Sequence, residues 1–170
     1  MIKDLARKFA TLEKFFGDVV AEIKFVRGEF KPELKILKEL RDFKLILIAT
    51  ETEKILLKLV TPRKKIKPAK GVRITAENKM QFFFSAADVS DFVKAVGEKN
   101  KIYKFTPPIV PPLLILQTLL KLPKFSSCES LKLRFKHFIT AGEPLTLKNI
   151  SEQNFEIESV GEVKILISID

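Results

Sequence analysis

The side chains best suited to chemistry lie in one short basic segment, residues 63–73. Six of its eleven residues carry a positive charge: Arg63, Lys64, Lys65, Lys67, Lys70 and Arg73. Like charges at this density repel one another, so the folded segment needs negative charge nearby. We therefore predict an anion-binding site here. Its partner is a lipid head group or anionic membrane surface, a nucleic acid, or the acidic C-terminal part of the same chain.

The net charge of +10 is unevenly distributed along the chain. Acids outnumber basic residues from Glu143 onward, which gives that part a net charge of −4 and leaves +14 on residues 1–142. Lys132, Arg134 and Lys136 add to the basic part, because they share one face of a predicted strand. This asymmetry favours an anionic partner for the larger part, or docking of the acidic part onto it.

Known catalytic and metal-binding patterns are absent from the sequence. A nucleophilic hydrolase needs a histidine beside its nucleophile, and His137 is the single histidine. It lies in an alternating segment, where a structural or exposed imidazole is the commoner role. Zinc sites need clusters of Cys and His, and phosphate-binding loops need clustered glycines, but the six glycines here are isolated. The sequence predicts a protein that is not an enzyme and needs no metal or cofactor.

An uncharged run, FTPPIVPPLLILQTLL, occupies residues 105–120. It is too short to cross a bilayer as a helix, which takes about 20 apolar residues, and four prolines interrupt its first half. It must be packed inside, contact a partner or a second copy of the chain, or line an apolar cavity. We predict a ligand cavity lined by Phe82, Phe84, Phe92, Ile109, Val110, Leu113, Leu116 and Leu120. The alternative is an ordinary tight core, which these residue types fill as readily.

Several elements are expected in the first part of the chain. An amphipathic helix starts at residue 2 and ends near Gly17, because apolar residues recur at steps of three and four. Alternation at residues 19–25 predicts a strand. Pro32 suits the first turn of a short helix that runs to about residue 40. β-Rich runs at residues 43–49 and 55–60 predict a hairpin.

Two further helices are expected in the second part. One covers residues 86–96, with Ser85 and Asp88 as its cap and Gly97 at its end. The other begins at Pro112 and runs to about residue 122. The predicted strands are residues 72–76, 80–84, 101–105 and an antiparallel meander from residue 131 on.

These elements define an α+β fold: a mixed or antiparallel sheet packed by three to four helices, with a β-rich C-terminal extension. We assign residues 1–125 to a ligand-binding domain and residues 126–170 to the extension that packs on it. A single cysteine, Cys128, and the lack of a secretory leader favour a cytoplasmic protein. Abundant Lys, Glu, Ile and Leu with little Asn, Gln, Met or Cys predicts a thermostable protein, with a melting temperature above the mesophile range.

Part of the chain resembles the sterol carrier protein family, which are small lipid-transfer domains. The resemblance covers residues 19–122. It rests on a hairpin, the basic segment, VRITAENKMQFFF, the capped helix SAADVSDFVKAVGEKN, the strand KIYKF and the apolar helix that follows. In that family the last helix forms one wall of a lipid tunnel. The resemblance therefore implies that a lipid is carried between these elements.

The function predicted from the sequence is non-catalytic binding or carriage of an apolar or amphipathic ligand such as a lipid. The basic segment would meet its anionic head group or a membrane. The alternatives are a basic accessory protein associated with nucleic acid and a subunit of a larger assembly, including a homo-oligomer.

Overall fold

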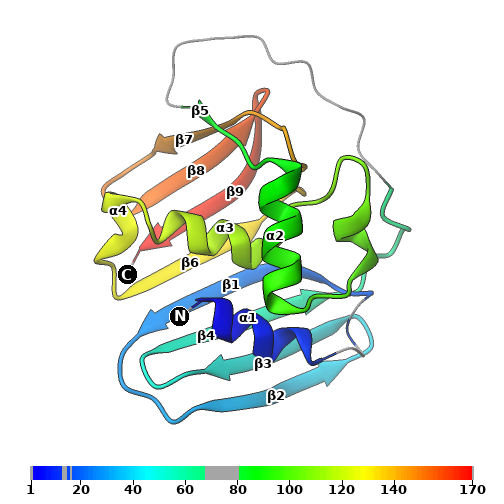
Figure 1. The fold of residues 1–170 in the computed structure, drawn as a ribbon. Coiled ribbons are helices and arrows are strands. Elements are labelled where there is room, and N and C mark those ends of the chain that lie inside the picture. The colour runs from blue at the N-terminus through cyan, green and yellow to red at the C-terminus, as the bar shows by residue number, and fades with distance from the viewer. Residues whose placement is uncertain (1, 13–14, 16, 68–80, 170) are drawn as a thin grey trace.

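One nine-stranded sheet organises the protein (Figure 1), and all of its strand pairs are antiparallel. The computed structural model describes residues 2–12, 15, 17–67 and 81–169. In this part the strand order is β2-β3-β4-β1-β6-β9-β8-β7-β5. The strands are β1 (Val19–Arg27), β2 (Glu33–Leu40), β3 (Phe43–Ala49), β4 (Glu53–Val60), β5 (Gln81–Phe82), β6 (Ser130–Phe135), β7 (Leu145–Asn149), β8 (Asn154–Ser159) and β9 (Glu162–Ile169).

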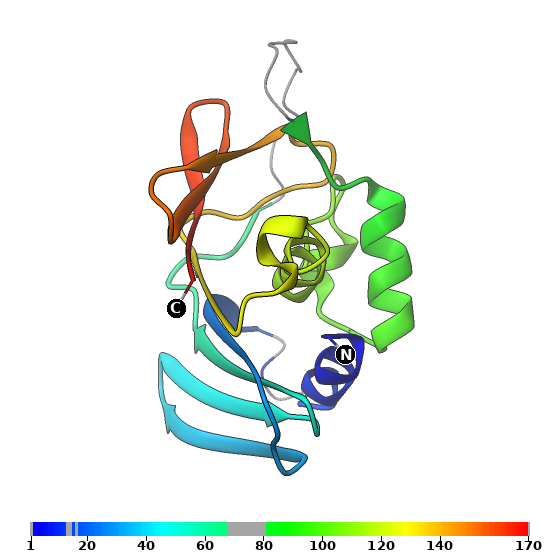
Figure 2. The ribbon, with the colours of Figure 1, turned by 90° about the vertical axis from the view of Figure 1, so that its left-hand side faces the viewer.

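The helices cover one face of this sheet (Figure 2). They are α1 (Ile2–Ala10), α2 (Ala86–Val96), the 3-10 helix η2 (Lys101–Lys104), α3 (Pro112–Leu119) and α4 (Pro123–Ser126). In Figure 2, α3 lies beside the sheet and α2 lies further out. Within the described residues, no helix has the length and apolar character that a bilayer crossing requires.

Alternating side chains give the sheet a buried face and a solvent face. On β1, Ile23 and Phe25 are fully buried, whereas Lys24 between them is exposed. The same buried face carries Ile55, Leu57, Leu131 and Leu133 from the neighbouring strands. The hydrophobic core therefore lies between this face and the helices.

α3 is buried on nearly every side. Pro112 occupies its first turn, where the N–H that a proline lacks would have no partner within the helix. Its buried residues are Leu113, Leu114, Ile115, Leu116 and Leu119. A helix that is apolar all round must be covered on more than one side, and here the sheet covers one side and α1 packs on another.

Two predicted elements are wrong. Residues 33–40 form the edge strand β2 instead of a helix, because their backbone pairs with β3 along its whole length. Residues 101–104 form η2 instead of a strand, because the Asn100 side chain accepts a hydrogen bond from the Ile102 amide and so caps a helical turn. The N-terminal helix is also shorter than predicted, since α1 ends at Ala10.

Other predictions are confirmed by the described residues. These are the β3–β4 hairpin, the capped helix α2, the helix that begins at Pro112, the β-rich C-terminal part, and an α+β fold with a large antiparallel sheet and few helices. The strand expected near residues 72–76 lies outside the described residues. The strand expected near residues 80–84 is β5, which spans Gln81–Phe82.

The C-terminal strands belong to the same sheet as the N-terminal strands. β6 pairs with β1 from Glu22 opposite Arg134 to Val26 opposite Ser130. β9, β8, β7 and β5 follow outward from β6. The division predicted between residues 125 and 126 falls inside α4, directly before the strand that joins the two parts.

Candidate functional site

An apolar hollow lies at the C-terminal end of α3. Its volume is about 110 Å³, and its walls are Phe82, Phe84, Ile115, Thr118, Leu119, Leu122 and Leu147. The Thr118 hydroxyl is already engaged, because it donates to the Leu114 carbonyl at 2.9 Å. An apolar cavity of roughly 150 Å³ holds a molecule the size of benzene. The apolar hollow is somewhat smaller, so it has room for a hydrocarbon segment of a few carbons.

A narrower gap lies at the N-terminal end of α3 and has a volume of about 20 Å³. Its walls come from β1, η2, the segment before α3, α3 itself and the residues around the end of β6. Tyr103 and His137 bring polar groups to walls that are otherwise apolar. α3 brings no free amide to this gap through its lining residues, because Pro112 has no N–H and the Ile115 amide donates to the Pro111 carbonyl at 3.2 Å.

The Tyr103 hydroxyl remains protonated at this gap. Burial and, to a smaller degree, the nearby Glu98 carboxylate raise the pKa of Tyr103 far above its usual range. Burial also raises the pKa of Glu98, although this carboxylate accepts hydrogen bonds from the amides of Lys99 and Asn100, each at 3.0 Å. Tyr103 can therefore act as a hydrogen-bond donor to a group in the gap.

His137 is paired with a carboxylate. Its Nε2 lies 3.3 Å from Oε1 of Glu162, and about half of each side chain is exposed. A hydrogen bond from Lys164 is the main reason that the pKa of Glu162 is lowered, so this partner is ionised. If Nε2–H donates to Glu162, Nδ1 of the neutral ring is left as an acceptor. A histidine held by a carboxylate in this way can take up a proton.

A basic cleft adjoins the gap at Ile102, which lines both. The cleft has a volume of about 610 Å³, and its basic wall residues are Arg63, Lys64, Lys65, Lys99 and Lys101. Asp18 also lines it, but Asp18 is bound by the Lys44 ammonium at 2.9 Å and by the Thr61 hydroxyl at 2.6 Å. The basic cleft therefore keeps the positive character that an anion needs.

The three spaces adjoin one another in a row, which we call the track. Ile102 is a wall of both the basic cleft and the gap, and Ile115 is a wall of both the gap and the apolar hollow. A ligand along this track would meet positive charge first, then Tyr103 and His137, and finally hydrocarbon side chains. Among the described residues, no group of three or more His, Cys, Asp or Glu side chains could hold a metal ion.

The predicted ligand residues fall at different places around this track. Phe82 and Phe84 line the apolar hollow, while Ile109 and Val110 line the gap. The other four lie in the hydrophobic core without lining either space: Phe92, Leu113 and Leu116 are buried there, and Leu120 packs partly buried against them.

The predicted anion-binding residues divide in a similar way. Arg63, Lys64 and Lys65 line the basic cleft, and Lys67 is exposed beyond it. Lys70 and Arg73 lie outside the described residues. Three of the C-terminal acids have partners in residues 126–170: Glu143 pairs with Lys164, Glu158 with Lys148, and Glu162 with His137 and Lys164.

The turn at residues 98–104 was missed by the sequence analysis, although it contributes Tyr103 to the gap and two lysines to the basic cleft. One signal was present. Asn100 follows closely on the helix end at Gly97, and an asparagine at such a position favours a capped turn over a strand. The pairing of His137 with Glu162 had no local signal, because His137 lies just after β6 whereas Glu162 begins β9, 25 residues further along the chain.

No family model and no curated protein matches the sequence. Solved structures do match the fold. HtdX from Mycobacterium tuberculosis has a TM-score of 0.65 at 10% identity, over 99% of this chain and 86% of that chain. A MaoC-like dehydratase from Phytophthora capsici has a TM-score of 0.55 at 12% identity, and the match covers 92% of this chain and 70% of that chain. An acyl-ACP thioesterase from Bacteroides thetaiotaomicron has a TM-score of 0.54 at 11% identity, and the match covers 98% of this chain and 81% of that chain.

These likenesses establish the fold and not the activity, since the identities are low. A large antiparallel sheet around a buried helix is consistent with a hotdog fold. The resemblance to sterol carrier proteins stays a prediction, because the matched structures reported above do not test it.

The prediction that the chain is not an enzyme is wrong in the light of these matches, because the dehydratase and the thioesterase that share its fold are enzymes. The prediction rested on missing sequence motifs. In a sheet of this kind, groups from distant strands and turns come together only in the fold, as His137 and Glu162 do, so no contiguous motif is needed.

Proposed function

We propose that this protein is an enzyme that acts on a fatty-acyl thioester. The observation that carries the proposal is that the basic cleft, the gap and the apolar hollow adjoin one another in this order. An acyl thioester on an anionic carrier has the same order of parts: negative charge, a reactive carbonyl and a hydrocarbon chain. Support also comes from the shared fold, since one protein of that fold is a thioesterase for acyl-ACP.

The residues around the gap supply two chemical roles. The Tyr103 hydroxyl would stabilise negative charge that develops on the carbonyl oxygen. His137, held by Glu162, would transfer a proton. Removal of water from an acyl chain and hydrolysis of a thioester both need these two roles, and the assay below distinguishes the reactions.

The activity is tested on coenzyme A thioesters of increasing acyl length. Release of free thiol reports hydrolysis, and the ultraviolet absorbance of an unsaturated thioester reports addition or loss of water. We expect turnover of one type, and His137→Gln to lower kcat by at least about 100-fold. Lys136→Gln, which removes a charge from the neighbouring residue, is the control and should leave kcat unchanged. No turnover of either type would overturn the proposal.

The acyl position is tested by filling the apolar hollow. Leu122→Phe enlarges a wall residue, so we expect kcat/KM for the longest accepted chain to fall about tenfold, with the shortest chains unaffected. The control is Val160→Phe, at a turn residue that is 75% exposed. An equal loss for every chain length would show that the acyl group lies elsewhere.

A further inference from the structure

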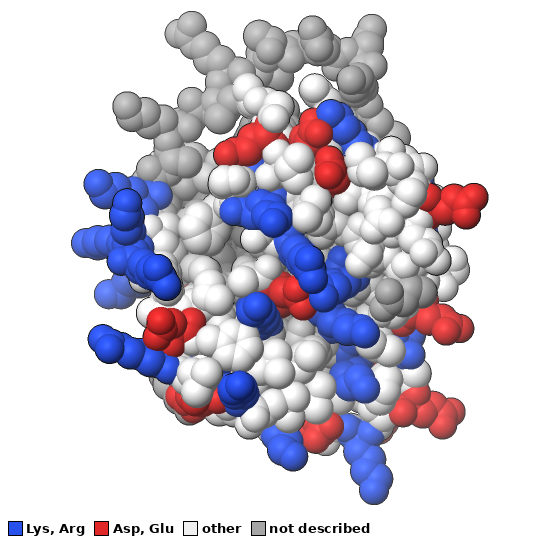
Figure 3. Space-filling view, turned by 180° about the vertical axis from the view of Figure 1, so that it is seen from behind, with Lys and Arg blue, Asp and Glu red and all other residues white. Residues whose placement is uncertain are grey.

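The solvent face of the sheet carries two rows of side chains that the proposed function does not use. The strand registers align one row as Lys35, Leu47, Leu56, Lys24 and Lys132, and the next row as Lys38, Leu45, Lys58, Glu22 and Arg134. Six cations therefore share this surface with one acid. We call these ten residues the lysine–leucine face, and the band of basic side chains across the middle of Figure 3 belongs to this side of the sheet.

Part of the positive charge on this face is balanced by a carboxylate of the protein itself. Glu22 accepts both Lys132 at 3.2 Å and Arg134 at 3.0 Å, so one carboxylate serves two cations. Lys24 lies directly opposite Lys132 on the neighbouring strand, and like charges in such positions oppose strand pairing. An anionic partner on this face would add to the negative charge that Glu22 supplies.

The face also has an apolar centre. Leu45, Leu47 and Leu56 are neighbours on adjacent strands and remain partly exposed. Lysines stand on both sides of them, and the Lys58 ammonium lies 5.4 Å from the centre of the Phe43 ring. Long lysine stems lie along apolar surface while their charged ends reach outward. Apolar side chains framed by lysines suit the boundary between lipid head groups and acyl chains.

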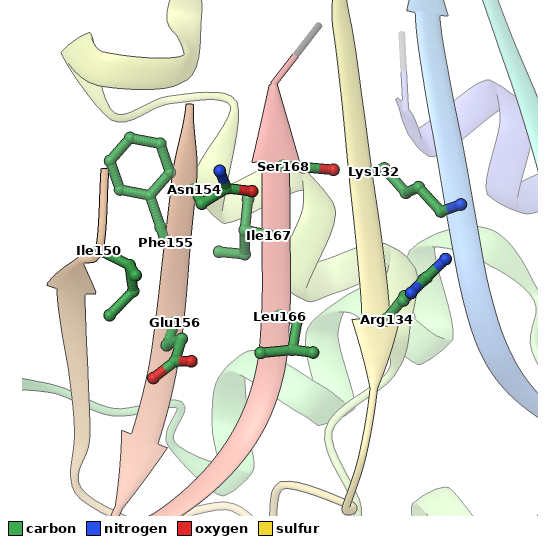
Figure 4. A pocket seen from close by; sticks show the side chains of 9 residues that line it. All are labelled: Lys132, Arg134, Ile150, Asn154, Phe155, Glu156, Leu166, Ile167 and Ser168. Atoms are coloured by element: carbon green, nitrogen blue, oxygen red, sulfur yellow. The ribbon is translucent and has the colours of Figure 1, made fainter. Parts of the chain in front are cut away.

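A shallow hollow extends the face beyond β6. It has a volume of about 420 Å³, and Figure 4 shows its lining residues on β6, β8 and β9 and at the end of β7. Leu166 and Ile150 give it apolar surface, Asn154 and Ser168 give it hydrogen-bonding groups, and Glu156 gives it a carboxylate. In Figure 4 the side chains of Lys132 and Arg134 lean away from the hollow toward β1, so their charged ends belong to the lysine–leucine face.

We propose that the lysine–leucine face binds the surface of a membrane that contains anionic lipids. Charge complementarity selects this partner. A second copy of the chain would bring rows of like charge together, and a nucleic acid would meet leucines where it needs aromatic side chains for base stacking. A lipid surface offers both negative charge for the lysines and an apolar boundary for the leucines. This surface lies on the opposite side of the sheet from α3 and does not depend on the proposed activity.

The test is flotation with vesicles of phosphatidylcholine alone and vesicles that also contain phosphatidylglycerol. We expect binding to the second kind only, and weaker binding as salt is added. Lys38→Gln with Lys58→Gln removes the two lysines beside Leu45. Each lysine near an anionic surface is worth about fivefold in binding, so the pair should lower the partition coefficient by roughly 25-fold.

Two matched double variants serve as controls. Lys94→Gln with Lys121→Gln removes the same charge from the helical side of the molecule, and Lys64→Gln with Lys65→Gln removes it from the basic cleft. Both should bind the anionic vesicles like the unmodified protein. The proposal would be overturned if the protein bound neutral vesicles equally well, or if the basic-cleft variant lost more vesicle binding than the Lys38 and Lys58 variant. It would also be overturned if the Lys38 and Lys58 variant lost binding to duplex DNA instead of binding to vesicles.

Discussion

Glu143 shows how a single buried charge ties the C-terminal part of the chain together. The residue is 5% exposed, and its carboxylate accepts a hydrogen bond from the Thr140 amide at 3.0 Å. The Lys164 ammonium lies 3.0 Å from the same carboxylate and 2.6 Å from Glu162. Burial lowers the pKa of Lys164, but the hydrogen bonds to Glu162 and Glu143 outweigh it, so the net shift is upward.

Loss of this pair should destabilise the fold. Glu143→Gln leaves Lys164 with one carboxylate in place of two, and we expect the free energy of unfolding in urea at neutral pH to fall by about 2–3 kcal/mol. Because the pKa of Lys164 is higher in the folded than in the unfolded protein, its charge stabilises the fold fully at pH values below the unfolded pKa, near 10.5. This contribution is lost as the pH rises through the pKa of the folded protein. The difference between the two proteins should therefore shrink in strong alkali. Glu152→Gln, at an exposed position, is the control, and an equal effect there would contradict the role of the pair.

At the scale of elements, α2 is held at its start by reciprocal hydrogen bonds. The Asp88 amide donates to the Ser85 hydroxyl oxygen at 3.1 Å, and the Ser85 amide donates to the Asp88 carboxylate at 2.7 Å. The Ser85 hydroxyl also donates to that carboxylate at 2.7 Å, and these bonds lower the pKa of Asp88. This motif fixes the point at which the helix begins.

Ser85→Ala should cost about 1 kcal/mol of stability at neutral pH. Because the pKa of Asp88 is lower in the folded than in the unfolded protein, its charge stabilises the fold fully at pH values above the unfolded pKa, near 3.8. This contribution is lost as the pH falls through the pKa of the folded protein. The cost of the substitution should therefore be smaller in acid, and the pKa of Asp88 measured by NMR should rise in the variant. A cost that does not change with pH, or an unshifted Asp88, would mean that the cap acts through the hydroxyl alone.

The elements that the sequence predicts well are those with local signals. The ends of α2 are set by Ser85, Asp88 and Gly97, and the β3–β4 hairpin follows from alternation around a polar turn. β2 was predicted as a helix because Pro32 suits a first helical turn, but residues 33–40 pair with β3 across a short turn at residues 41–42. Pairing with the next strand outweighs a start signal of this kind.

The candidate site also has residues with a local sequence signal and residues that only the fold brings together. The basic segment is contiguous, so three of its residues could be placed at the basic cleft from the sequence. The apolar hollow combines β5, α3 and β7, and a burial pattern cannot tell Phe84 at its wall from Phe92 in the solid core. Both are buried phenylalanines, and only the path of the chain separates them.

At the scale of the whole molecule, β1 and β6 join two halves into one sheet. β1 lies between β4 and β6, and its Ile23 and Phe25 are fully buried where Leu133 and Leu131 lie opposite. Removal of β6–β9 would expose this buried row and leave the β1 backbone unpaired on one side. It would also uncover Phe125, which is fully buried and stacks edge-on against Phe155 of β8 at 5.1 Å.

Residues 1–125 should therefore not fold by themselves. We expect this fragment to lack the far-ultraviolet circular dichroism of a folded α+β protein and to show no cooperative transition in urea, because the apolar surface that it exposes outweighs its remaining contacts. In the full chain, circular dichroism and Tyr103 fluorescence should report one coincident transition. If the fragment gave a cooperative transition, or if the two probes separated in the full chain, the halves would be independent domains and the junction between β1 and β6 would be a contact between them rather than the middle of a single core.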